Sequence, residues 1–170
     1  MRRTNWFDRN FPPVEDNGLL PGIIERLEGT PARLAEKIGR LPVDPDKGLP
    51  TGKWSVKKEI GHLTDLEPLW YERLFQVIGG VPDMKAADLT NRKTHETPHD
   101  AKTYGELVAE FRTEREKFIA KLRSLKDDDL NKTSLHPRLK TPMKVIDLAL
   151  FVAEHDDHHL AQMTVLMDAF

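Results

Sequence analysis

Three of the seven histidines in this 170-residue chain stand close together near its end, in the segment EHDDHH at residues 154–159. The segment lies inside an apolar-rich run, 145–167, where a buried polar side chain is costly unless it has a partner. If the run is helical, His155 and His159 lie one turn apart on one face, and their imidazoles can hold one metal ion. His158 could replace His159 as a ligand, although its direction, about 60° to the other side of His155, favours the helix flank. The alternative is that the clustered histidines form a polar helix face.

Two segments also resemble the zincin signature HExxH, whose histidines bind zinc and whose glutamate is a general base. His155 and His159 enclose Asp156 in the position of the glutamate, but aspartate is shorter, and the eleven residues after His159 hold no further histidine or glutamate. The segment HETPH at residues 95–99 matches the signature literally. Pro98 argues against the helix that would put its two histidines on one face. Neither segment is therefore expected to be a zincin site.

Composition narrows the classes of function. The chain has no cysteine, so a metal must be held by nitrogen and oxygen ligands. Its net charge is -2 and it has no dense basic tract, which argues against nucleic-acid binding. The N-terminus lacks the apolar core of a signal peptide, and no apolar span reaches the length of a membrane helix. A single soluble domain over residues 1–170, located in the cytoplasm and not bound to membranes, is expected.

Apolar residues recur at helical spacing in four segments. The first, 19–40, contains Gly29-Thr30-Pro31, where a kink or short break is expected because proline removes a backbone donor. A loop rich in proline and glycine, 42–53, separates it from the second helix, 55–79, which has Ser55 as a suitable N-cap.

The third helix is predicted over 103–124. The fourth is predicted to start with Thr141 as cap and Pro142 in the first helical position, and to run to about residue 168. No stretch alternates long enough to predict a strand. The fold class is therefore expected to be all-α, a four-helix bundle.

The heights of the histidines along the bundle indicate its topology. His62 lies roughly 10 Å after the start of the second helix, whereas His155 and His159 lie roughly 14 to 20 Å before the end of the fourth. Antiparallel packing of these two helices brings the three histidines closest in height. That arrangement requires an up-down-down-up bundle with a long crossover between helices 2 and 3, and residues 80–102 are long enough to provide it.

Two motifs carry a resemblance to a known family. They are Trp54-Ser55-x-x-x-Glu59-x-x-His62-Leu63 and His155-Asp156-x-His158-His159-Leu160-x-Gln162. Together they resemble the DinB superfamily, which includes the YfiT-like proteins. The resemblance implies an up-down-down-up bundle, a divalent metal held by His62, His155 and His159, and often a homodimer. Characterised members include thiol-dependent S-transferases and isomerases, others are described as metal-dependent hydrolases, and many have no known activity.

Three neutral imidazoles leave a metal with an open position for water or substrate, as in catalytic sites. Zinc or nickel is the expected metal. Glu59 and Gln162 are candidates for orienting the ligand histidines. In the 80–102 loop, Asn91, Arg92 or His95 is expected to touch a substrate at the mouth of the pocket.

The leading functional hypothesis is a metal-dependent enzyme that transfers a low-molecular-weight thiol, its cosubstrate, onto a small electrophile. The alternatives are a metal-dependent hydrolase of a small amide or ester, and a non-catalytic, stress-related metal-binding bundle. Trp54, Trp70 and Phe151 are expected in the core or in the pocket wall. Glu67 and Arg73 are expected to form an exposed or half-buried charge pair.

Overall fold

The first long helical segment is broken at the predicted place. The computed structural model describes residues 4–41 and 52–167, so the predicted loop at 42–53 lies almost wholly outside the described residues. Short 3-10 helices, Trp6–Asp8 and Asn17–Leu19, precede α1 (Leu20–Glu28) and α2 (Thr30–Ile38). Gly29 joins α1 to α2, and its N–H still donates to the carbonyl of Glu25. Pro31 falls in the first turn of α2, where its missing N–H costs no helical hydrogen bond.

The second and third long helices start at the caps that their sequences provide. Ser55 caps α3 (Val56–Ile78), and its Oγ accepts a hydrogen bond from the backbone N–H of Lys58. Thr103 and Glu106 form a reciprocal capping box at the start of α5 (Tyr104–Arg123). These boundaries confirm the predicted helices to within one residue.

The predicted start of the last helix is wrong. Pro142–Met143 form a short strand, β2, which pairs in antiparallel fashion with β1 (Ser134–Leu135). The final helix, α7, spans Val145–Met167. Asp147, and not Thr141, accepts a hydrogen bond from a backbone N–H at the helix start, that of Lys144, and it also accepts one from Val14 in the N-terminal segment. The two strands escaped prediction because two residues are too few to show an alternating pattern.

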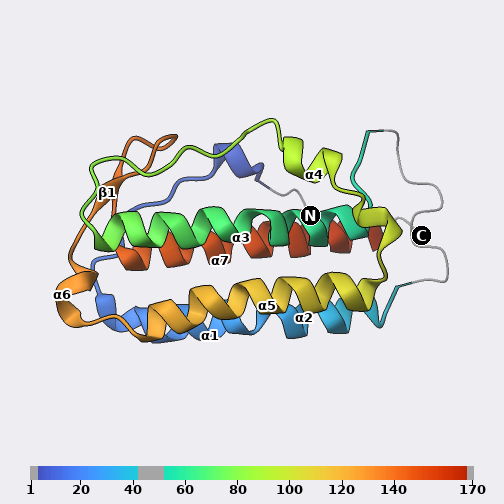
Figure 1. Cartoon of the computed structure of the whole chain (residues 1–170), viewed down its shortest axis with the longest axis horizontal. Helices are drawn as coiled ribbons and strands as arrows, with labels where there is room; N and C mark the ends of the chain where they lie inside the picture. The colour runs from blue at the N-terminus through green and yellow to red at the C-terminus, as the bar shows by residue number, and fades with distance from the viewer. Residues whose placement is uncertain (1–3, 42–51, 168–170) are drawn as a thin grey trace.

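The directions of the helices confirm the up-down-down-up topology. In Figure 1, α1, α2 and α7 run from left to right, whereas α3 and α5 run from right to left. The crossover after α3 passes back along the bundle and carries α4 (Arg92–Glu96) and a 3-10 helix, His99–Ala101 (Figure 1). A one-turn helix, α6 (Asp127–Leu130), follows α5 at the left end. Within residues 4–41 and 52–167, no helix combines the length and the apolar character needed to cross a membrane.

A buried ion-pair network joins the long helices. Arg115 on α5 is 1% exposed, and its guanidinium lies 2.6 Å from Glu67 Oε1 on α3 and 2.5 Å from Asp156 Oδ2 on α7. The Thr30 hydroxyl also donates to Asp156, at 2.8 Å. The expected exposed or half-buried pair of Glu67 and Arg73 is therefore wrong. Both side chains are buried, and Glu67 pairs with Arg115 instead.

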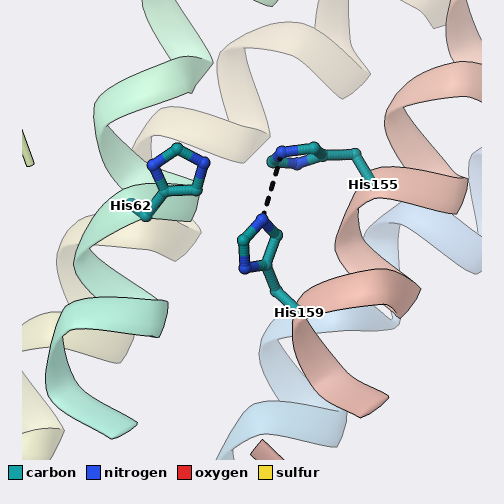
Figure 2. A group of neighbouring side chains, drawn as sticks. All are labelled: His62, His155 and His159. Carbon is teal, nitrogen blue, oxygen red and sulfur yellow. Dashed lines mark hydrogen bonds between the residues drawn. The ribbon is translucent and has the colours of Figure 1, made fainter. Parts of the chain in front are cut away.

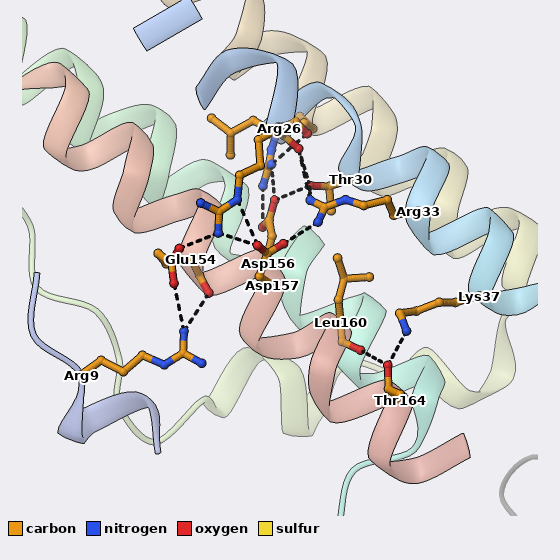
Figure 3. Close-up of polar contacts among 12 residues, drawn as sticks. Arg9, Arg26, Thr30, Arg33, Lys37, Glu154, Asp156, Asp157, Leu160 and Thr164 are labelled. Carbon is orange, nitrogen blue, oxygen red and sulfur yellow. Dashed lines mark hydrogen bonds and ion pairs between the residues drawn. The ribbon is translucent and has the colours of Figure 1, made fainter. Parts of the chain in front are cut away.

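The face of α7 that looks toward α1 and α2 is held by further ion pairs (Figure 3). Asp157 accepts from Arg26 and Arg33, and Glu154 accepts from Arg9 and Arg26. Asp156 and Asp157 are engaged by arginines, whereas His155 and His159 lie toward α3, where they meet His62. Asp156 cannot act as the base of a zincin-like site, because both of its carboxylate oxygens bind Arg115.

Candidate metal centre

The structure brings His62 from α3 together with His155 and His159 from α7. The three side chains are buried, at 4%, 5% and 8% exposure, and each offers one ring nitrogen in a group whose members all lie within 4.8 Å of one another. Figure 2 shows the rings converging from the two antiparallel helices. The three histidines singled out from the sequence thus share one small volume, although they are separated by up to 97 positions in the chain.

Glu59 determines the orientation of the His159 ring. Its Oε2 lies 2.6 Å from Nδ1 of His159, so an ionised carboxylate there accepts the Nδ1–H. The tautomer that results leaves Nε2 with a lone pair facing the other two histidines. A carboxylate behind a ligand imidazole fixes its tautomer and raises its basicity. Gln162, the other candidate for such a role, is half-buried one turn beyond His159 near the end of α7, and its role stays a prediction.

A second chain of contacts, absent from the sequence-based expectations, orients His62. The Thr94 hydroxyl has a single proton, which it donates to Asp65 Oδ2 at 3.0 Å. It must therefore accept the hydrogen bond from Nδ1 of His62, which lies 3.0 Å away. The Nε2 atom of His62 is then unprotonated and available as a ligand. His99 completes the chain, with its Nε2 2.9 Å from Asp65 Oδ2.

The spacing of two of the donors fits a tetrahedral metal. The Nε2 atoms of His155 and His159 lie 3.2 Å apart. Two nitrogens bound to zinc at about 2.05 Å with a tetrahedral angle would be separated by about 3.3 Å. Without a metal, one proton must lie between these two atoms, since two lone pairs would repel. His155 Nδ1 is buried without a hydrogen-bond partner among the described residues, so that proton can move to Nδ1 when a metal takes the Nε2 lone pairs.

The environment keeps the ligands neutral. Burial, and to a lesser extent the neighbouring His159, lower the pKa of His62 to about 3. Burial also lowers the pKa of His155 well below its usual value, and His159 adds to this effect. Metal binding requires neutral imidazole. Competition by protons should therefore begin at a more acid pH than for free histidine, whose pKa is about 6.5.

A cavity of about 380 Å³ opens onto the three histidines. Its wall is mainly apolar and includes Trp54, Trp70 and Phe151, which confirms their expected place in the core or pocket wall. His158 lines it as well, with its ring 5.2 Å from that of His159. The crossover contributes the following residues to the cavity: Ala86, Ala87, Asp88, Leu89 and Asn91.

Of the three crossover residues expected to touch a substrate, Asn91 lines the cavity. Arg92 and His95 are exposed and are not part of its lining, although the His95 ring lies 5.7 Å from Trp54. The zincin-like segment at 95–99 is interrupted as expected, because α4 ends at Glu96. His99 is buried beside Asp65, so the two histidines of that segment do not share a helix face.

Gly61 sits in α3 directly before His62, and its missing side chain makes room for His99. A Cβ at position 61 would lie 2.3 Å from both Cγ and Nδ1 of the His99 ring. Gly61→Ala should therefore displace His99, disturb the Asp65–Thr94–His62 contacts, weaken metal binding and lower the free energy of unfolding by about 1–3 kcal/mol. Urea unfolding and metal titration measure both effects. Gly105→Ala on α5 is the control, because a Cβ there meets nothing within 4 Å.

Glu59 offers a direct test of ligand orientation. Glu59→Gln removes the negative charge behind His159 while keeping the size of the side chain, and it should lower metal affinity by about 10–100-fold. Competition with a chromogenic chelator measures that affinity. Glu116→Gln, at an exposed position on α5, should leave it unchanged. Equal affinities for the two variants would show that Glu59 does not support the site.

Comparison with known proteins agrees with this architecture. The family model of the DinB superfamily matches residues 10–163. No curated protein matches the chain. Among solved structures, YfiT from Bacillus subtilis is similar, with a TM-score of 0.75, 23% sequence identity, and coverage of 92% of this chain and 91% of that one. It is described as a probable metal-dependent hydrolase with an unusual four-helix bundle topology. The match over nearly the whole chain establishes that this protein belongs to the DinB superfamily.

Proposed function

We propose that this protein is a metal-dependent enzyme in which His62, His155 and His159 hold a divalent metal, zinc or nickel. We further propose that it transfers a low-molecular-weight thiol onto a small electrophile. The observation that carries the proposal is the cavity that reaches the three histidines from the surface. A purely structural metal site is normally closed by four protein ligands, whereas three ligands beside a cavity leave a position for an exchangeable molecule.

The carboxylates near the three histidines favour a thiol over water as the nucleophile. Glu59 is engaged by His159, Asp65 by Thr94 and His99, and Asp156 by Arg115. Among the described residues that line the cavity, Asp88 is the single carboxylate, and it belongs to the crossover. It accepts hydrogen bonds from Thr90 and from the backbone of Arg92.

A site without a free carboxylate beside the metal suits a nucleophile that ionises easily. A bound metal lowers the pKa of a coordinated water or thiol. A free thiol has a pKa of about 8.5, whereas that of bulk water is about 15.7. The thiol therefore needs much less help from a general base. Because the chain has no cysteine, the thiol must be a separate molecule.

The proposed transfer forms one sulfur–carbon bond and breaks one bond of the electrophile. The thiol gives up its proton to solvent, and its sulfur supplies the electron pair of the new sulfur–carbon bond. The leaving group departs with the electrons of the bond that breaks, or, in an epoxide, the ring oxygen keeps them. The protein's part is to hold the electrophile in the aromatic cavity and to exclude bulk water from the reacting atoms.

The test compares reactions with and without thiol. The metal-loaded protein should consume an epoxide or an activated halide only when a low-molecular-weight thiol is supplied. Adding the thiol to cobalt-substituted protein should change its visible spectrum. The metal-free protein is the control and should be inactive.

Hydrolysis is the second candidate, favoured by the description of YfiT as a probable metal-dependent hydrolase. It would be established if ester or amide substrates were cleaved without thiol and no thiol altered the cobalt spectrum. Absence of turnover in both assays would identify the protein as a non-catalytic metal-binding bundle.

We also propose that residues 1–170 form one domain and that the protein acts in the cytoplasm as a homodimer. The dimer is supported by its frequency in the family that the chain resembles. Light scattering of the purified protein should give twice the mass of the 19.5 kDa chain. A monomeric mass would contradict this proposal.

A further inference from the structure

The cavity that reaches the three histidines has a second polar group of residues, Arg73, His136 and Arg138, in its wall. Arg73 is 2% exposed, and its Nε donates to the carbonyl of Lys85 at 2.9 Å. Among the residues that the structure describes, no carboxylate forms an ion pair with Arg73 or Arg138. A buried cation without a counterion is costly, so Arg73 needs an explanation beyond packing.

The hydrogen bonds of His136 show that it presents a proton to Arg73. Its Nδ1 accepts from the backbone N–H groups of Leu139, at 3.1 Å, and Arg138, at 3.3 Å. Nδ1 therefore carries no proton, and a neutral imidazole must carry one on Nε2. That atom lies 3.2 Å from Nη1 of Arg73, which is also a donor and cannot accept. Two donors thus face each other, and the described part of the chain provides no acceptor that both can share.

Arg138 adds a further unsatisfied donor. Its guanidinium lies over the Phe7 ring, 5.1 Å from the centroid, and its Nη2 is buried without a hydrogen-bond partner among the described residues. Burial, together with the charge of Arg138, lowers the pKa of Arg73 to about 10. Burial likewise lowers the pKa of His136 to about 3, and the two arginines contribute to that shift. The electrostatic influences on this group come from cations, as expected for a site that is complete only with an anion.

We propose that Arg73, His136 and Arg138 bind the carboxylate group of the molecule that reaches the three histidines. This inference rests on the proposed function, since it concerns the substrate of the same cavity. A carboxylate has two acceptor oxygens that match the fork of a guanidinium, and its single negative charge compensates the buried arginine. It also supplies the acceptor that Arg73 Nη1 and His136 Nε2 lack.

The distance between the two groups indicates the shape of the ligand. His62, Leu66, Trp70 and Arg73 follow one face of α3 and all line the cavity. Eleven positions of helix separate His62 from Arg73, a backbone rise of about 16 Å, but their side chains bring the two groups closer together. Trp70 lies between the two ends, with its ring 5.3 Å from the Arg73 guanidinium and 5.5 Å from the ring of His155, so these two groups are at most about 11 Å apart. The ligand is therefore elongated, with a carboxylate at one end, an apolar middle and the reacting atom at the other.

The experiment measures binding of an unreactive carboxylate by calorimetry. The probe is 3-phenylpropanoate, and its matched neutral analogue is 3-phenylpropanamide. Wild-type protein should bind the carboxylate at least tenfold more tightly than the amide, both as purified and after removal of metal by a chelator. Arg138→Gln and Arg73→Gln should each weaken carboxylate binding at least tenfold. Arg112→Gln, at an exposed position outside the cavity, should leave it unchanged.

Arg138 is half-buried in a loop, so Arg138→Gln keeps the test decisive even if Arg73→Gln fails to fold. The proposal is overturned if the carboxylate does not bind, if the amide binds equally well, or if Arg138→Gln matches Arg112→Gln. Loss of carboxylate binding after chelation would assign the carboxylate to the metal and also overturn it. If 2-phenylethylphosphonate bound more tightly than 3-phenylpropanoate, the site would be assigned to a phosphate-like group and the carboxylate proposal would be overturned. Carboxylate binding is also measured on metal-free protein, so its outcome does not depend on the thiol-transfer assay. The two proposals can therefore fail separately.

Discussion

Alanine at position 62, 155 or 159 should abolish stoichiometric metal binding while the bundle remains folded. Each of these histidines supplies one of three ring nitrogens that lie within 4.8 Å of one another. Loss of one ligand should cost more than the 10–100-fold in affinity that loss of an orienting contact costs. Elemental analysis of protein purified without a nickel column measures the metal content. Circular dichroism of the same samples confirms that the helices are retained.

The control for this prediction is His158→Ala. His158 lines the same cavity and contacts the rings of His159 and Trp6, but it is not part of the three-histidine group. Its removal should leave one metal per chain. Full metal occupancy in His62→Ala would show that the third ligand is misassigned. Loss of metal in His158→Ala would show that His158, and not His159, is a ligand.

Arg115→Ala should lower the free energy of unfolding by about 3–5 kcal/mol, the cost of breaking a buried ion pair from one side. Burial by itself lowers the pKa of Arg115, but Asp156 and Glu67 hold it above its usual value, so the side chain stays charged. Without it, Glu67 and Asp156 lie close together in the core with no cation between them. Urea unfolding followed by circular dichroism measures the loss.

The control is Arg112→Ala, one turn earlier on α5, where the side chain is exposed. A surface change of this kind should alter stability by no more than about 0.5 kcal/mol. If Arg115→Ala were equally mild, the network would contribute nothing to stability. Because Asp156 directly follows His155, the Arg115 variant should also loosen the ligand geometry, and its metal affinity should be lower than that of Arg112→Ala.

Local spacing in the sequence determined the helices and part of the site. Ser55, Thr103 and the break at Gly29 act on neighbouring backbone groups within a turn, so their effect can be read without knowledge of the fold. The pairing of His155 with His159 has the same origin, because helix geometry alone brings positions four apart onto one face. The height of His62 and the length of the 80–102 crossover then sufficed for the topology, since rise per residue is constant in a helix.

Tertiary packing decided the features that depend on contacts between distant segments. Arg115 was indistinguishable in sequence from the exposed charges around it, and Glu67 had Arg73 as an equally plausible partner until three helices packed together. The helix α7 begins at Val145, later than predicted, because Pro142 and Met143 pair as a strand with residues 134–135.

Asp65, Thr94 and His99, which support His62, left a single local signal in the sequence, Gly61. A glycine inside a helix indicates a close approach by another group. Arg73, His136 and Arg138 lie up to 65 positions apart. The sequence could not show that their donors need an acceptor. That need arises when the fold buries them in one cavity, because an unpaired donor is costly where water cannot reach it.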